Sequence, residues 1–175
     1  MLGDAVSEME DKWRGPAQLA SVGIMEKLLE ETEGHPKGRI YDLRNEYYWQ
    51  TAQHRQQFKL GEEINAENGR GHYSMIVGGA WYAHQLLGFD RIAMAKSYLS
   101  KVKKAWPKLQ EYNKENNNIY YYYALALGLN GDYNEMKHTL TAYKNKIGLK
   151  KDNTHIKKLR MIIKDHQDKG RIPKS

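Results

Sequence analysis

Apolar residues recur along this chain at intervals of three and four, the spacing that places side chains on one face of an α-helix. One clear example lies within residues 90–106, where the apolar face consists of Ile92, Ala95, Leu99 and Val102. Strict alternation of apolar and polar residues, the pattern of a half-buried strand, is almost absent. The pattern therefore predicts an all-α fold.

Glycine and proline divide the N-terminal half of this pattern into helices. The first predicted helix ends before Gly34 and carries an apolar stripe of Ala20, Ile24 and Leu28, with Met25 and Leu29 beside it. The second is predicted as one long helix over about residues 38–65, because no proline or glycine interrupts the pattern before Gly61.

The following segments are also predicted to be helical. Residues 73–87 are apolar on nearly every side, which indicates a buried helix. Pro107 is expected to end the next helix, over 90–106. The last predicted helix spans 154–167 and is amphipathic, with lysines outward and three residues inward: Ile156, Leu159 and Ile163.

Residues 116–148, NNNIYYYYALALGLNGDYNEMKHTLTAYKNKIG, contain two periodic segments joined at Gly131. Large and small residues recur there at fixed offsets: Tyr120, Tyr123, Ala124, Leu127, Tyr133, Met136, Leu140 and Tyr143. This spacing resembles a tetratricopeptide (TPR) unit, a helix-turn-helix repeat of about 34 residues. A weaker copy covers residues 76–107, where Asp90 holds the position of Gly131. The two registers are 41 residues apart, so the implied array is irregular.

The resemblance implies antiparallel helical hairpins stacked as a TPR-like array. The helix over 154–167 would cap that array with its lysine-rich face outward. We therefore expect an N-terminal segment over residues 1–14, a single helical domain over 15–167 and a frayed basic tail over 168–175.

The resemblance also implies a binding groove, because the first helices of TPR hairpins line a concave surface. The offsets that face it fall on four residues: Asn118, Tyr121, Tyr122 and Leu125. An apolar, aromatic groove is typical of a peptide-binding surface. Alternatively, Tyr121 and Leu125 pack against the preceding hairpin or the chain's own terminus. Tyr120 and Tyr123 are interpreted as packing residues.

The net charge of +7 is unevenly distributed along the chain. Residues 1–88 hold 9 Lys and Arg against 13 Asp and Glu, whereas residues 89–175 hold 19 against 8. Near the C-terminus a predicted basic surface consists of Lys150, Lys151, Lys157, Lys158 and Arg160. Such clustering is typical either of a solvated lysine-rich face or of a surface for RNA or DNA.

No residue pattern in the chain indicates catalysis. There is no cysteine and no G-x-S-x-G motif, and the seven histidines form no i, i+4 pair that would place two metal ligands on one helical face. We therefore expect no enzymatic activity, no metal and no cofactor.

The remaining expectations concern location and partners. No apolar run approaches the length of a membrane span, so we expect no membrane insertion. The acidic N-terminus favours a cytoplasmic protein, and an extracytoplasmic chain that has lost its leader stays open. The hypothesis is a scaffold or adaptor that binds another protein or peptide, with nucleic-acid binding as the alternative. A monomer is favoured over a homodimer.

Overall fold

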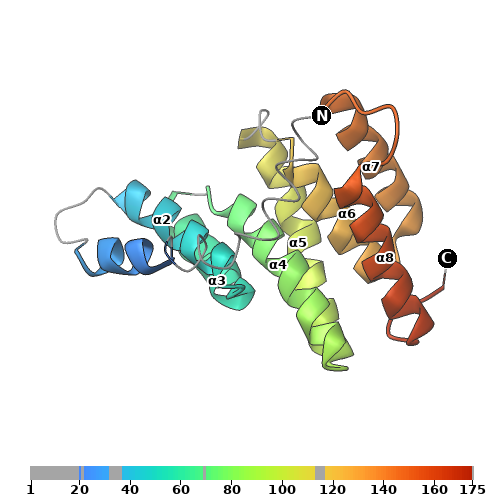
Figure 1. The fold of residues 1–175 in the computed structure, drawn as a ribbon, viewed down its shortest axis with the longest axis horizontal. Helices are drawn as coiled ribbons and strands as arrows, with labels where there is room; N and C mark the ends of the chain where they lie inside the picture. Colours follow the sequence, from blue (N-terminus) through green and yellow to red (C-terminus); the bar gives the residue numbers. More distant parts are fainter. Residues whose placement is uncertain (1–19, 21, 32–36, 69, 113–116, 175) are drawn as a thin grey trace. The chain divides into compact units, whose positions relative to one another are not determined.

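The computed structural model describes residues 20, 22–31, 37–68, 70–112 and 117–174, and within them it contains helices and no strand (Figure 1). The all-α prediction is confirmed for this part of the chain. Contacts between residues divide the chain into two units, Met1–Gln53 and His54–Ser175, a division that the sequence pattern did not indicate. The predicted N-terminal segment over residues 1–14 lies outside the described residues.

In the first unit, the N-terminal helix buries a different face from the one predicted. Ile24 and Leu28 are 60% and 46% exposed, whereas Met25 is only 6% exposed. The exposed Glu26 carboxylate of this helix accepts a 2.9 Å hydrogen bond from the Tyr47 hydroxyl of helix α2, Lys37–Gln50. The prediction was therefore wrong for Ile24 and Leu28, whereas Met25, which the pattern placed beside them, is buried.

The long helix predicted over residues 38–65 is in fact two helices, α2 and α3, His54–Asn68. Ala52 adopts a left-handed conformation with φ of 54°. The Gln53 amide donates to the Tyr48 carbonyl at 2.8 Å, and the Ala52 amide donates to the next carbonyl, of Trp49, at 3.2 Å. These two bonds form a Schellman motif, which ends α2 without a glycine.

The second unit is built around helix α4, His72–Gly88, which contacts α3 on one side and α5, Ile92–Tyr112, on another. Two adjacent glycines make these contacts close: Gly78 meets the backbone of α3, and Gly79 meets side chains of α3 and α5. Most of α4 is buried, as its apolar composition predicted.

Helix α5 continues past Pro107, contrary to the prediction that this proline would end it. The proline is exposed at the surface of the helix. The apolar face also continues, because Leu109 beyond the proline is 4% exposed. Burial of that extra turn offsets the backbone hydrogen bond that proline removes.

Helices α4 and α5 form a first hairpin. Helices α6, Ile119–Asn130, and α7, Tyr133–Lys146, form a second one, and α6 also contacts α4 and α5. The Trp106 ring of α5 stacks on Tyr123 with centroids 4.1 Å apart and meets the edge of Tyr120 at 5.1 Å. The prediction that Tyr120 and Tyr123 are packing residues is confirmed.

The turns of the two hairpins share one backbone geometry. Asp90 after α4 and Gly131 after α6 both have positive φ, of 57° and 89°. In each turn the following amide donates to the carbonyl five residues earlier, at 2.8 Å and 2.9 Å. Asp90 therefore occupies a backbone position that favours glycine. The same bond pattern follows α7 and α8, at Gly148 and Gly170.

Helix α8, Thr154–Asp168, buries the predicted apolar face against the rest of the second unit. Its inward residues are at most 5% exposed: Ile156, Leu159 and Ile163. The Asn153 side chain accepts a 3.0 Å hydrogen bond from the Ile156 amide and caps the helix. Contacts with α6 place α8 beside that helix.

The residues after α8 make specific contacts, in contrast to the frayed tail expected over 168–175. Ile172 is 7% exposed. The Arg171 guanidinium pairs with Asp90 at 2.7 Å, and the Pro173 carbonyl accepts hydrogen bonds from Tyr133 and Gln167. The described end of the chain therefore packs along the turns of both hairpins.

Candidate functional site

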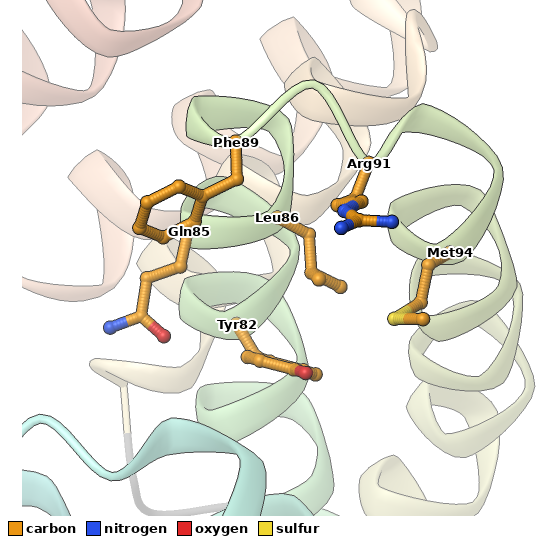
Figure 2. A pocket seen from close by; sticks show the side chains of 6 residues that line it. All are labelled: Tyr82, Gln85, Leu86, Phe89, Arg91 and Met94. Atoms are coloured by element: carbon orange, nitrogen blue, oxygen red, sulfur yellow. The ribbon is translucent and has the colours of Figure 1, made fainter.

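An open groove lies between the last turns of α4 and the first turns of α5, with a volume of about 500 Å³ (Figure 2). Tyr82 and Leu86 project from α4 toward α5, and Met94 projects from α5 beside them. We call this groove the tip groove; it is lined by Tyr82, Gln85, Leu86, Phe89, Arg91 and Met94.

Two large apolar side chains of the tip groove are exposed. The Phe89 side chain is 77% exposed and that of Met94 is 48% exposed, whereas Leu86 between them is buried. Phe89 immediately precedes the left-handed Asp90, and its ring lies on the outside of the last turn of α4, beside Gln85 (Figure 2). Exposed apolar groups that gather around a hollow are typical of binding surfaces.

Arg91 is the one charged residue that lines the tip groove. Its neighbour Asp90 pairs with Arg171, and no acid in the described part of the chain forms an ion pair with Arg91. Tyr82 is held by an edge-to-face contact with Tyr98, with ring centroids 4.8 Å apart. The groove thus offers a fixed apolar wall beside a cation that is available to a carboxylate.

The four residues of the predicted peptide groove lie in different environments. Leu125 is fully buried and Tyr121 is 7% exposed, so both pack inside the chain as the alternative interpretation expected. The Tyr121 ring contacts Tyr143 and His155, and burial, followed by the effect of Tyr143, raises the pKa of Tyr121 to about 12. Asn118 is exposed and Tyr122 is half-buried, and their role in binding stays a prediction.

The predicted basic surface is exposed at all five residues. Arg160 forms a 2.9 Å ion pair with Asp152, and the Lys158 ammonium lies 5.8 Å from the centre of the Trp81 ring. The other three have no acidic partner within the described residues: Lys150, Lys151 and Lys157.

A pair of histidines, which the sequence did not reveal, connects α4 to α8. The His84 Nδ1 atom lies 2.8 Å from His166 Nε2, across 82 residues of sequence. His166 is 1% exposed, and its Nδ1 atom has no hydrogen-bond partner among the described residues. Burial, and then the neighbouring His166, lower the pKa of His84 to about 4, and burial, followed by Arg171, lowers the pKa of His166.

Two further observations limit the chemistry of this part of the chain. No three His, Cys, Asp or Glu side chains among the described residues are placed to hold a metal ion together. None of the described helices is both long and apolar enough to cross a membrane.

A scan of the chain against protein-family models finds no match, and comparisons with curated proteins and with solved structures find none either. Function is therefore inferred from the chemistry of the surfaces themselves.

Proposed function

We propose that the chain is a non-enzymatic scaffold or adaptor module, built as a TPR-like array of helical hairpins, that binds another protein or a peptide. The contacts of α6 support the array, because α6 packs against both helices of the preceding hairpin as well as against α7. The left-handed turn residues at Asp90 and Gly131 support it too, since they occupy equivalent places in the two hairpins. Helix α8 would be the cap.

The tip groove is the binding site that the geometry supports best, and one observation carries this choice: Phe89 is 77% exposed in a groove that Arg91 also lines, and Arg91 pairs with no acid in the described part of the chain. Energetic hot spots in interfaces are enriched in aromatic residues and arginine that become desolvated on binding. A matching peptide would bury an apolar side chain against Phe89 and Met94 and place a carboxylate on Arg91. We therefore propose an acidic peptide segment with a large apolar residue as the ligand.

Selection from displayed random peptides with the full chain as bait tests this assignment. We expect the selected peptides to share an aromatic or branched apolar residue close to Asp or Glu. Phe89→Ser and Arg91→Glu should each weaken binding of those peptides at least about tenfold, which corresponds to about 1.4 kcal/mol. Neither change removes a buried contact, so circular dichroism should show an unchanged helical fold.

Met161→Ser is the matched control, because Met161 is an equally prominent apolar side chain, 71% exposed, that lies on α8 outside the tip groove. This variant should bind the selected peptides as tightly as the parent chain. Equal binding by Phe89→Ser, or selected peptides without any acidic preference, would reject the tip groove as the site.

The exposed lysines support a second candidate function, binding of RNA or DNA through the basic surface. Lys150, Lys151 and Lys157 carry positive charge that no acid within the described residues offsets. Binding to phosphates weakens steeply as salt rises, whereas burial of an apolar side chain in the tip groove does not. Ionic strength therefore separates the two functions.

A further inference from the structure

Helix α8 covers the face of α6 that carries the predicted peptide groove. The His155 ring of α8 lies 6.0 Å from the Tyr121 ring, centre to centre. Two turns further along both helices, a β-carbon placed on Gly128 would lie 2.7 Å from the Ile163 side chain. Leu125 lies between these two contacts on α6 and is fully buried. The two helices therefore run in the same direction, and α8 lies over this face.

The His84–His166 contact attaches α8 to α4 as well. The centroids of the two rings are 5.0 Å apart, and the two nitrogens are 2.8 Å apart. The difference between these distances is about the sum of the two ring radii. The nitrogens therefore lie between the rings and point at each other, which is the geometry of one N–H···N hydrogen bond. Such a bond needs an unprotonated acceptor, so it is lost when both rings carry a proton on the facing nitrogens.

The groups that face this pair make protonation unfavourable. His54 of α3 faces His84, and the other charged groups come from α8 and the residues after it: Lys158, Asp165, Lys169 and Arg171. Asp165 favours a protonated ring, but it also forms a 2.7 Å ion pair with Lys169. A proton on His166 Nδ1 would have no hydrogen-bond acceptor among the described residues. The pair is thus stable as two neutral rings.

We propose that the His84–His166 contact is an acid-sensitive latch, which holds α8 over the face of α6 at neutral pH and makes its opening more frequent in mild acid. Release would expose Tyr121 and Leu125, together with the inner face of α8. Those residues then form the apolar surface that the sequence pattern predicted, but only in the released state.

The direction of the pH effect follows from linkage. In the released state both rings return toward the ordinary histidine pKa of 6.5, whereas in the latched state their pKa values are lower, about 4 for His84. A histidine with a lowered pKa stabilises the latched state fully when the pH is above 6.5. That stabilisation is lost as the pH falls from 6.5 toward 4. The latch is therefore closed at pH 7.5 and weakened at pH 5.

Hydrogen exchange of the full chain at pH 7.5 and pH 5.0 tests the latch, with each rate corrected for the intrinsic effect of pH. For His84 alone, linkage predicts that protection of the α8 amides falls roughly 10- to 30-fold at pH 5.0. Protection in α3 and α5, which have no extensive contact with α8, should change much less. Unchanged protection of α8 would overturn the proposal.

Paired substitution of His84→Gln and His166→Gln keeps one hydrogen bond possible but removes both titrating rings. This variant should lose most of the pH dependence of α8, whereas His138→Gln, at an exposed histidine on α7, should behave like the parent chain. The same fall in protection in the paired variant would also overturn the proposal.

An NMR titration of the parent chain gives an answer even if the paired variant does not fold. Both rings should titrate below the ordinary histidine pKa while α8 stays protected. Titration of either ring near 6.5, with α8 still protected, would show that the contact is not a latch.

Discussion

At Gly78 the backbones of α3 and α4 approach so closely that no side chain fits between them. A β-carbon there would lie 2.6 Å from the amide nitrogen of Phe58 and 2.8 Å from the carbonyl oxygen of His54. Both are backbone atoms, so a larger residue must separate the two helices. We expect Gly78→Ala to lower the free energy of unfolding by at least about 1–3 kcal/mol, as measured by urea denaturation.

Gly88, at the end of the same helix, is the control for that substitution. A β-carbon there would meet no atom within 4 Å, and the residue does not have positive φ. Gly88→Ala should therefore be neutral or raise the stability by up to about 1 kcal/mol, because alanine favours the helix. Similar destabilisation by both substitutions would show that helix propensity rather than the close approach governs these positions.

The end of α2 shows how one residue can separate two helices. Ala52 adopts the left-handed conformation that glycine adopts without strain, at a cost of about 1–2 kcal/mol for an L-residue. Ala52→Gly should therefore raise the protection of the α2 amides by an amount equivalent to about 1 kcal/mol, measured by hydrogen exchange.

The same substitution inside a helix should lower the stability instead of raising it. Ala142 lies within α7, is only partly buried and has a helical conformation, so Ala142→Gly should cost about 1 kcal/mol of stability. A loss of protection in α2 on Ala52→Gly would contradict the left-handed geometry of that turn.

The elements that sequence predicted well are those whose signal is local. The periodic apolar residues of α5 and α8 identified their buried faces, because one helix side meets the core along its whole length. The break at Ala52 was missed because alanine carries no turn signal, and its backbone geometry comes from hydrogen bonds of neighbouring residues. Pro107 was misread for a related reason: the burial of Leu109 beyond it is a tertiary effect.

The candidate sites were harder to predict than the helices, because each depends on residues from separate elements. The sequence left open whether Tyr121 and Leu125 face a groove or pack inside the chain, and only the structure shows that both are buried. The His84–His166 contact joins residues 82 positions apart, and no spacing rule within one helix can reveal it. Phe89 reads as an ordinary apolar residue until the turn places it outside α4.

Across the whole molecule, positive charge is concentrated in one of the two units. Residues 54–175 hold 22 Lys and Arg against 11 Asp and Glu, whereas residues 1–53 hold 6 against 10. If the basic surface binds single-stranded RNA through three phosphate contacts, affinity for a 20-nucleotide poly(U) probe should fall about 20-fold between 50 and 200 mM salt. Reversal of three lysines to Glu should abolish that dependence: Lys150, Lys151 and Lys157.

The control is a second variant in which three other lysines are changed to Glu, so that the two variants have the same net charge. Its three exposed lysines lie on α3, α5 and α7: Lys59, Lys96 and Lys137. Fluorescence polarisation should show that this control retains the salt dependence. Equal loss of affinity in both variants would mean that total charge alone attracts the RNA, and unchanged affinity of the first variant at low salt would exclude the basic surface.

The latch also has a consequence for the order in which the second unit assembles during synthesis. Helices α3 to α7 make their main contacts with near neighbours in sequence, so each hairpin can form as soon as it leaves the ribosome. The partners of His84 and Asp90 come 82 and 81 residues later in the sequence, so they are translated after all of these hairpins. Until α8 has been synthesised, the face of α6 that it covers is an exposed apolar surface on the growing chain. A nascent chain stalled before α8 should therefore be the form that a chaperone recognises.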